Sequence, residues 1–359
     1  MARFYSLQIK DIVKETSDCT SIAFEVPADL EKIFTFTQGQ HLTLRTEIEG
    51  EDIRRSYSLC SSPLEKELRV AVKQIEEGKF STYANQVLKV GDKLEVMPPM
   101  GKFYTELRPD QTKNYVAFAA GSGITPIISI IKTTLKTEPN STFTLFYSNK
   151  QVQSIIFKEE IEGLKNKFLQ RFQVFHFLTQ EQLDIPLFNG RFTGEKLSDI
   201  FSKLIQPDEV DECFLCGPED MTFEIKDFLL EKGIEAKKIH FELFTTAESR
   251  NRVPRKVQKT ANKGPVSKIT VKDGGKSFAF DLPFDTMNIL DAAMQKGADL
   301  PFACKGGVCC TCKARLIEGE VDMEVNYALE PEEIAAGYIL TCQSYPTSEK
   351  VVVDYDEAI

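Results

Sequence analysis

Four of the chain's nine cysteines lie within nine residues, and this crowding constrains the fold more than any other feature. Cys304, Cys309 and Cys312 have C-x4-C-x2-C spacing, and Cys342 follows after a further 29 residues. This is the spacing of plant-type [2Fe–2S] sites, in which three thiolates on one tight loop and a fourth from a distant strand surround two irons. Glycines inside the loop let it wrap closely around the sulfurs. We therefore predict that Cys304, Cys309, Cys312 and Cys342 are metal ligands.

Other metal sites fit these residues less well. Zinc motifs usually pair C-x2-C with another such pair or with histidines, and this region lacks both. A Rieske centre needs two histidine ligands, but His41, His176 and His240 are all distant in sequence from the cysteines. Cys310 adjoins Cys309, so we expect it to point away from the cluster and to be a bystander.

The size and composition are those of an ordinary globular protein with two or three domains. The chain has 359 residues, of which 42% are hydrophobic and 27% charged. Its first residues alternate like a strand and lack the long apolar core of a secretory signal, and no later stretch approaches the roughly 20 apolar residues of a membrane span. We therefore expect a cytoplasmic protein whose cysteines do not form a disulfide framework.

The negative charge is concentrated near the C-terminus. Residues 266–359 contain 8 Lys and Arg against 16 Asp and Glu, and so carry −8 of the formal charge of −10. An acidic balance argues against nucleic acid as a partner. It is compatible with docking onto a basic protein surface, although solubility alone explains it equally well.

The chain divides into three segments by pattern. Residues 1–107 show short alternating strands, such as 68–73 and 93–97, which predict an antiparallel β-barrel. In residues 112–245, strands at 115–120, 142–147 and 212–216 alternate with helices, which predicts a parallel α/β sheet.

A basic stretch, 246–265, is predicted to be a linker, either a solvated tether or a strap lying on the acidic domain. Strands resume in residues 266–359, with a hairpin turn at 273–275 and a helix starting near Thr286. The overall expectation is a multidomain protein with one α/β and two β-rich domains.

Two motifs in the first segment favour a flavin. Arg55, Tyr57 and Ser58 lie on a predicted strand, where the arginine could pair with a phosphate, the tyrosine could cover an isoalloxazine ring and the serine could hydrogen-bond its edge. Further along, a glycine and a hydroxyl open a helix whose free N–H groups suit a pyrophosphate. The residues of this second motif are Lys73, Gly78, Lys79, Phe80 and Ser81.

The second segment carries a dinucleotide-binding pattern. A strand runs into Gly121, Ser122 and Gly123, followed by Thr125 and Pro126, which we expect to cap and open a helix. Glycines at the carboxyl end of a parallel strand let a pyrophosphate approach the backbone. The run of Cys216, Gly217 and Pro218 ends another strand, where the nicotinamide should lie. Cys213 lies three residues earlier and so should face the opposite side of the sheet, as a core residue.

The end of the strand near 147 bears on the choice of nucleotide. An acid at this position binds the ribose 2′-hydroxyl of NADH, whereas basic or hydroxyl groups favour a 2′-phosphate. Here the chain carries Ser148 and Lys150 and no acid. NADPH is therefore favoured, with NADH possible.

Taken together, these motifs resemble a known family. Those of the first two segments, with Glu242-Leu243-Phe244, resemble the ferredoxin–NADP⁺ reductase superfamily, and the C-terminal cysteines resemble a fused plant-type ferredoxin of β-grasp-like fold. More closely, residues 36–44, 301–308 and 326–331 resemble the reductase subunits of bacterial phenylacetyl-CoA 1,2-epoxidase complexes. The match departs at Cys310, where alanine is usual, and at Lys79, where arginine is commoner; neither change should block binding.

The resemblance implies an electron path and a client. FAD would be held by Arg55, Tyr57, Ser58, Gly78 and Ser81, with Phe244 near the flavin and Cys216 beside the nicotinamide. Tyr57, Ser58, Cys216 and Phe244 would thus be the catalytic residues. Electrons would pass from NADPH through FAD and the [2Fe–2S] cluster to the diiron oxygenase subunits of a multicomponent monooxygenase, which epoxidises phenylacetyl-CoA during phenylacetate catabolism.

Two other hypotheses stay open at this point. The same cofactors could serve another oxygenase or hydroxylase, or a hybrid-cluster protein, because cofactor motifs do not identify the acceptor. A non-catalytic redox sensor would carry the cluster but would not need a complete hydride path.

Overall fold

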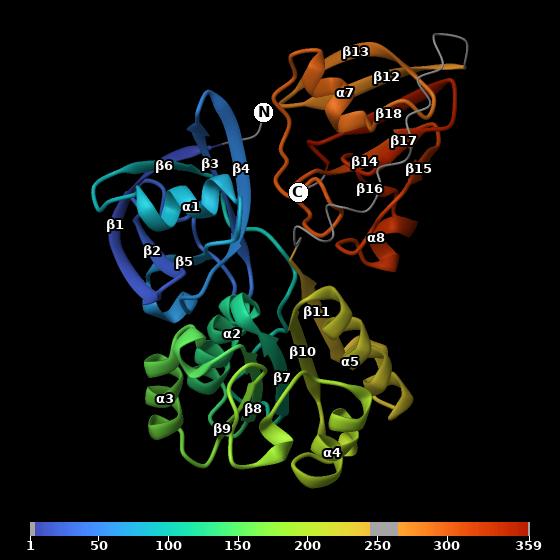
Figure 1. Cartoon of the computed structure of the whole chain (residues 1–359). Coiled ribbons are helices and arrows are strands. Elements are labelled where there is room, and N and C mark those ends of the chain that lie inside the picture. Colours follow the sequence, from blue (N-terminus) through green and yellow to red (C-terminus); the bar gives the residue numbers. More distant parts are fainter. Residues whose placement is uncertain (1–3, 245–264, 358–359) are drawn as a thin grey trace. The chain divides into compact units, whose positions relative to one another are not determined.

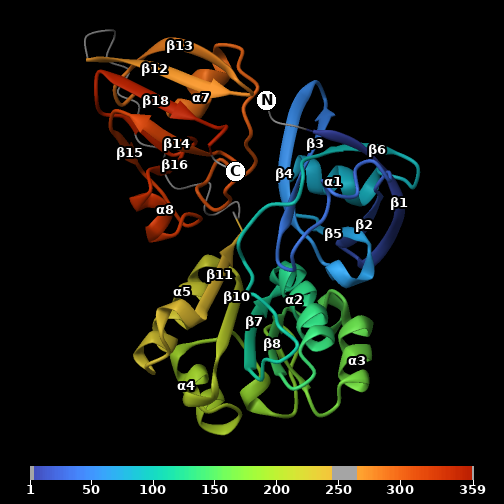
Figure 2. The ribbon, with the colours of Figure 1, turned by 180° about the vertical axis from the view of Figure 1, so that it is seen from behind.

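The computed structural model describes residues 4–244 and 265–357 (Figures 1 and 2). It contains two compact units, one formed by Ser6–Ile53 with Tyr57–Phe244 and the other mainly by the C-terminal segment. The predicted linker 246–265, and with it the strap hypothesis, lies outside the described residues except for Pro265. Among the described residues, no helix is long and apolar enough to cross a membrane.

The first part of the larger unit is an antiparallel β-barrel of six strands. Their order is β4-β3-β6-β1-β2-β5, and a bridge between Leu59 and Val70 joins the chain after β4 to β5, which brings the two edges of the sheet together. The predicted strands at 68–73 and 93–97 are β5 and β6. The elements are β1 (Tyr5–Thr16), β2 (Cys19–Glu25), β3 (His41–Ile48), β4 (Glu51–Ser58), β5 (Leu68–Lys73), α1 (Lys79–Gln86) and β6 (Lys93–Val96).

The second part is a five-stranded parallel sheet of order β11-β10-β7-β8-β9, with helices on both faces (Figure 1). Helices α2 and α3 share one core with the sheet, and α4 and α5 share the other. The strand order reverses between β7 and β10: β8 and β9 are added on one side of β7, and β10 and β11 on the other. Open α/β sheets bind ligands at such a topological switch point. The elements are β7 (Asn114–Ala120), α2 (Ile124–Thr137), β8 (Thr142–Asn149), α3 (Lys158–Lys167), β9 (Phe172–Leu178), α4 (Gly194–Lys203), β10 (Glu212–Gly217), α5 (Glu219–Glu231) and β11 (Ile239–Leu243).

The structure extends and corrects the sequence prediction in this part. It adds β9, α4 and β11 to the three strands and three helices that the pattern indicated. Helix α2 begins at Ile124, with Gly123 as its N-cap, so the expected capping role of Thr125 was wrong. A 3₁₀ turn over Gly121–Gly123 runs directly into the helix, which places Thr125 inside the first turn, where its hydroxyl donates to Ser122 O at 3.0 Å.

The C-terminal unit is a five-stranded mixed sheet of order β13-β12-β18-β14-β16, beside a small pair formed by β15 and β17. Strands β12 and β18 are parallel, and the other pairs are antiparallel. One helix, α7, packs into the core of this sheet. The elements are β12 (Val266–Asp273), β13 (Lys276–Pro283), α7 (Ile289–Gln295), β14 (Lys313–Glu318), β15 (Val321–Met323), α8 (Pro331–Ala335), β16 (Tyr338–Leu340), β17 (Ser344–Pro346) and β18 (Lys350–Asp354).

The predicted hairpin joins β12 to β13. Gly274 and Gly275 have φ values of 60° and 72°, which a two-residue turn of the primed type requires. The predicted helix starts later than expected, at Ile289. Asn288 caps it by accepting a hydrogen bond from Asp291 N, whereas the Thr286 hydroxyl donates to Pro283 O in the preceding turn.

Candidate functional site

The four predicted cluster ligands converge in the C-terminal unit. Three lie on the loop of residues 304–312, which we call the cluster loop. Cys309 Sγ lies 3.1 Å from Cys304 Sγ, and the Gly306 amide donates to Cys304 Sγ at 3.3 Å. The loop is tightly wound: Gly307 has a φ of 73°, and a Cβ there would lie 2.7 Å from Val325 O.

Strand pairing brings the fourth cysteine to this loop. Strands β14 and β16 pair antiparallel, with Lys313 opposite Leu340. Cys312 and Thr341, the residues adjacent to this pair, therefore lie next to each other, and the Thr341 hydroxyl donates to Cys312 O at 3.0 Å. Cys342 follows directly and interacts with Cys312. The 29-residue gap in the sequence is thus closed by one short strand pair.

The four thiols interact in two pairs. A hydrogen bond from Cys309 lowers the pKa of Cys304, and one from Cys312 lowers the pKa of Cys342, while the same contacts and burial raise the pKa values of Cys309 and Cys312. Cys309, Cys312 and Cys342 are buried, so the thiols form two contacting pairs largely shielded from water. Four soft sulfur donors, with N–H groups aimed at them, fit a [2Fe–2S] cluster.

Cys310 differs from its neighbours. Its thiol lies 3.1 Å from Ala328 O, and its side chain packs against the apolar core of the unit. This contact supports its expected role as a bystander.

The predicted flavin residues of β4 lie at the end of that strand. Arg55 donates to Arg54 O at 2.7 Å, and the Tyr57 ring lies 5.4 Å from the Phe80 ring. Phe80 is only 1% exposed, so its backbone, and not its ring, is available to a cofactor. A guanidinium, a half-buried phenol ring and the start of helix α1 are the groups that a flavin dinucleotide requires.

The turn before α1 is closed by a hydroxyl. Ser81 Oγ accepts from Ile75 N at 3.2 Å and donates to Gly78 O at 3.1 Å. A Cβ at Gly78 would lie 2.4 Å from this oxygen, so the turn requires glycine. The Lys79 ammonium pairs with Glu51 at 2.7 Å on the surface. The hydroxyl of Ser81 therefore closes the turn before α1 from within.

The glycine loop, residues 121–123, lies between β7 and α2. A Cβ on Gly123 would lie 2.0 Å from Cys216 O, so only glycine lets the start of α2 approach the end of β10. Gly121 has a φ of 52°, and its carbonyl accepts from Tyr147 OH at 3.0 Å. The Lys73 ammonium lies 4.0 Å from where a Gly121 Cβ would be, which places a positive charge beside the loop. Backbone N–H groups, a helix start and a cation suit a pyrophosphate.

Further predicted residues lie along the same sheet edge. Ser148 is buried near the end of β8, and Lys150 is exposed just beyond it. Gly217 ends β10, and Pro218 is the N-cap of α5. Cys216 and Cys213 pack into the cores on opposite faces of the sheet, as their spacing predicts.

An acidic residue that was absent from the predicted site joins the two halves. Glu242 on β11 accepts a hydrogen bond from Ser58 Oγ at 3.0 Å, and its other oxygen lies 3.9 Å from His41 Nδ1. Its register partner on β10 is Cys216. The available signal for Glu242 was its position as an acid near the end of a strand that leads into Phe244. Phe244 packs against the core that contains Cys216.

Burial determines the protonation state of two side chains near Glu242, those of His41 and Cys216. Burial lowers the pKa of His41 to about 4, so its imidazole is neutral at pH 7. Burial also raises the pKa of the Cys216 thiol, and the carboxylate of Glu242 adds to this effect, so the thiol stays protonated. His41 and Cys216 are thus both neutral beside the Glu242 carboxylate, where the two halves meet.

Comparison with known proteins identifies three domains. The chain matches an oxidoreductase FAD-binding domain over residues 6–104, an oxidoreductase NAD-binding domain over 118–227 and a 2Fe-2S iron-sulfur cluster binding domain over 271–347. It is 45% identical to one of the subunits of the 1,2-phenylacetyl-CoA epoxidase of Escherichia coli (strain K12), with 99% of each chain covered. It is also 32% identical to the ferredoxin reductase component of the 3-ketosteroid-9-alpha-monooxygenase of Rhodococcus rhodochrous, over 99% of this chain and 97% of that one.

The chain belongs to the family of oxygenase reductase components. The solved structure of phthalate dioxygenase reductase shares its fold, with a TM-score of 0.60 at 23% identity and 98% of each chain covered. The predicted fold class is therefore confirmed. Membership of this reductase family makes the chain an oxidoreductase that uses FAD, a nicotinamide nucleotide and a 2Fe-2S cluster, and that transfers electrons from NAD(P)H through FAD to the cluster.

Proposed function

We propose that this chain transfers electrons from NADPH to the oxygenase subunits of a phenylacetyl-CoA epoxidase in the cytoplasm. The observation that carries the proposal is the 45% identity to the epoxidase component of Escherichia coli (strain K12), since the alignment covers 99% of both chains. None of the nine cysteines forms a disulfide, which fits a reducing compartment.

The proposal assigns each cofactor to residues of one segment. Residues 1–107 would bind FAD, residues 112–245 the nucleotide and residues 266–359 the cluster. When bound, FAD accepts a hydride and the [2Fe–2S] cluster carries single electrons. Cys304, Cys309, Cys312 and Cys342 would hold the cluster, while Arg55, Tyr57, Ser58, Gly78 and Ser81 would hold the flavin.

The protein's own part is to bind, orient and shield. The glycine loop and the Lys73 ammonium would hold the nucleotide pyrophosphate beside the start of α2. The hydrogen bond from Ser58 to Glu242 fixes the barrel edge against β11, and Cys216 and Phe244 lie next to this contact. These residues would set the flavin and nicotinamide sites against each other without a general acid or base triad.

We assign NADPH as the preferred nucleotide. Ser148 lies near the end of β8, the second strand of the parallel sheet in chain order, and Lys150 follows that strand. No acid occupies positions 147–151, where one would favour the ribose 2′-hydroxyl of NADH. Comparing kcat/KM for NADPH and NADH measures this preference directly.

Substrate-coupled turnover tests the proposed acceptor. The chain loaded with FAD and iron–sulfur cluster would be mixed with the purified oxygenase subunits of a phenylacetyl-CoA epoxidase. We expect NADPH consumption that depends on phenylacetyl-CoA and yields the epoxide.

The oxygenase of a 3-ketosteroid-9-alpha-monooxygenase is the matched comparison, because reductase components of that system are also relatives. If that oxygenase, or a hybrid-cluster protein, received electrons faster than the epoxidase subunits, the assigned client would be wrong. Negligible reduction of cytochrome c by NADPH would instead indicate a redox sensor.

A further inference from the structure

One face of helix α2 is polar where it contacts a turn of the β-barrel. The turn spans residues 61–65, just after β4, and the helix residues that meet it are spaced three and four apart, so they lie along one side of the helix. We call this set of interactions the α2–turn contact. It consists of Ser129 Oγ to Ser61 O at 2.6 Å, Ser62 Oγ to Thr133 Oγ1 at 2.9 Å, Lys132 Nζ to Glu65 Oε2 at 2.9 Å and Lys136 Nζ to Glu65 Oε1 at 3.0 Å.

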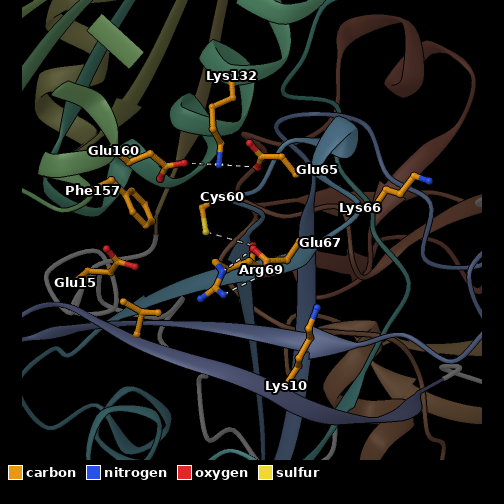
Figure 3. A pocket seen from close by; sticks show the side chains of 11 residues that line it. Lys10, Glu15, Cys60, Glu65, Lys66, Glu67, Arg69, Lys132, Phe157 and Glu160 are labelled. Atoms are coloured by element: carbon orange, nitrogen blue, oxygen red, sulfur yellow. Dashed lines mark hydrogen bonds and ion pairs between the residues drawn. The ribbon is translucent and has the colours of Figure 1, made fainter. Parts of the chain in front are cut away.

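Lys132 is the buried charge in this contact. Its side chain is only 6% exposed and lies between two carboxylates, Glu65 from the turn and Glu160 from α3, the latter at 2.8 Å (Figure 3). Burial alone would lower the pKa of Lys132, but the two carboxylates outweigh it and raise the pKa. The lysine is therefore charged at neutral pH and ties the barrel turn to two helices.

Glu65 is held from three directions. It accepts from the Ser62 amide at 2.9 Å, as the capping box of its own turn, and it pairs with Lys132 and Lys136. Burial would raise the pKa of Glu65, but the Ser62 hydrogen bond and the Lys132 charge outweigh it and lower the pKa. Both members of the pair are ionised, so removing either leaves the other with one counter-ion fewer: Lys132 keeps only Glu160 of its two carboxylates, or Glu65 keeps only Lys136 of its two lysines.

A cavity of about 440 Å³ lies beside this pair. It is bordered by charged side chains that pair with one another, for example Arg69 with Glu67 at 2.8 Å (Figure 3). Cys60 and Phe157 belong to the apolar core that α2 shares with the barrel, and the cavity interrupts that core beside Lys132. Polar contacts therefore add to the apolar packing in holding α2 against the turn there. The residues that line the cavity are Lys10, Val13, Glu15, Cys60, Glu65, Lys66, Glu67, Arg69, Lys132, Phe157 and Glu160.

The α2–turn contact connects the two cofactor sites. The turn begins three residues after Ser58, at the end of the flavin-site strand, and α2 begins at the glycine loop beside Cys216. We propose that Lys132 is a positioning residue for hydride transfer, which sets the distance between the flavin and nicotinamide sites by holding α2 against the turn. This inference rests on electron transfer from NAD(P)H to FAD and is independent of the final acceptor.

Electrostatics predict what loss of the pair would do. Both carboxylates lie within 3 Å of the same ammonium nitrogen. Without the cation, they would repel each other across a partly buried gap of only about 6 Å. We expect relief of this repulsion to move the turn away from α3 and to leave the α2–turn contact without its buried cation. Hydride transfer is sensitive to such movement, since a displacement of about 1 Å can cost on the order of 100-fold in rate.

Two matched variants of the FAD- and cluster-loaded chain test the proposal. Glu65→Gln and Glu160→Gln each remove one carboxylate from Lys132, but only Glu65 lies on the barrel side of the contact. The glutamine oxygen at position 65 can still accept from the Ser62 amide, so the turn keeps its cap. Flavin reduction by NADPH at saturation would be followed by anaerobic stopped-flow absorbance. We expect E65Q to be slower than the unsubstituted chain by about tenfold and E160Q by less than about twofold.

Lys132→Met is the stronger variant and Lys136→Met its control, because Lys136 is partly exposed and, among the residues that the structure describes, pairs with Glu65 alone. We expect K132M to slow flavin reduction at least as much as E65Q, and K136M to change it little, with nucleotide KM altered by less than about threefold. A purely structural role would lower the melting temperature without separating E65Q from E160Q in rate. If those two variants reduced flavin at equal rates, the positioning role would be refuted, even if K132M failed to fold.

Discussion

The cluster loop and the junction of the flavin and nicotinamide sites are assembled in opposite ways. Three of the four cluster thiols come from nine consecutive residues, and one strand pair supplies the fourth. The junction instead joins Ser58, Cys216 and Glu242, which are separated by up to 184 positions. A site encoded locally shows itself in spacing, whereas a site assembled by two domains appears only once the domains are packed.

The two regions also differ in how they tolerate change. The cluster loop depends on ligand identity, because a metal centre needs each of its donors. The junction depends on backbone approach and on neutral buried groups, so steric and electrostatic changes should damage it most.

Replacing a cluster ligand should have the largest effect. In Cys342→Ser, one member of the Cys312 and Cys342 pair is lost. We expect loss of iron and acid-labile sulfide, and a fall of at least about 100-fold in cytochrome c reduction by NADPH, with ferricyanide reduction by the flavin nearly unchanged. The control is Cys310→Ala, which should keep its cluster. Retention of the cluster in C342S, or its loss in C310A, would show that spacing alone misassigned the ligands.

A methyl group in the glycine loop should be the most damaging small change at the junction. In Gly123→Ala the new Cβ would lie 2.0 Å from Cys216 O. This oxygen is a backbone atom, and a Cβ has no rotatable bond, so neither atom can turn away. We expect the free energy of unfolding to fall by about 3 kcal/mol or more, measured by urea unfolding. Gly163→Ala on α3 is the matched control, since its Cβ meets nothing within 4 Å; it should stabilise the chain by roughly 0.5–1 kcal/mol. Equal stabilities of the two variants would contradict the close approach.

The buried histidine predicts how stability depends on pH. His41 has a pKa of about 4 when folded, because burial disfavours its charged form, against 6.5 when exposed. Between these values the unfolded chain binds more protons, so the free energy of unfolding falls as the pH drops from about 6.5 to about 4. The loss attributable to His41 should reach about 3 kcal/mol and then level off.

His41→Gln isolates this contribution, because glutamine does not titrate. Urea unfolding of both chains at several pH values gives the difference. The stability of the unsubstituted chain should fall faster than that of the variant across this window. Parallel pH profiles would mean that His41 is not held neutral by burial.

The same contrast explains what the sequence predicted and what it missed. Cys304, Cys309, Cys312 and Cys342 could be assigned because ligand chemistry fixes both residue type and spacing. Glu242 could not be assigned to Ser58, because nothing in either local pattern encodes a contact across two domains. The helix start at Ile124 was missed for a related reason: Thr125 and Pro126 are favourable at a helix start, but the close approach of Gly123 to Cys216 decides where the helix begins.

The smallest expected effect concerns the nucleotide preference. We predicted this preference from a local sequence pattern, although the nucleotide would bind at the assembled junction. Lys150 is exposed just beyond β8, so its attraction to a 2′-phosphate is screened by water and salt. In Lys150→Gln we expect kcat/KM for NADPH to fall by about tenfold, equivalent to about 1.4 kcal/mol, while that for NADH changes little. Lys158→Gln, which removes another exposed lysine at the start of α3, controls for net charge and should affect both nucleotides equally. An equal loss with NADH in K150Q would mean that Lys150 binds a group common to both nucleotides, and the preference for NADPH would then have to come from Ser148 or from residues outside this strand end.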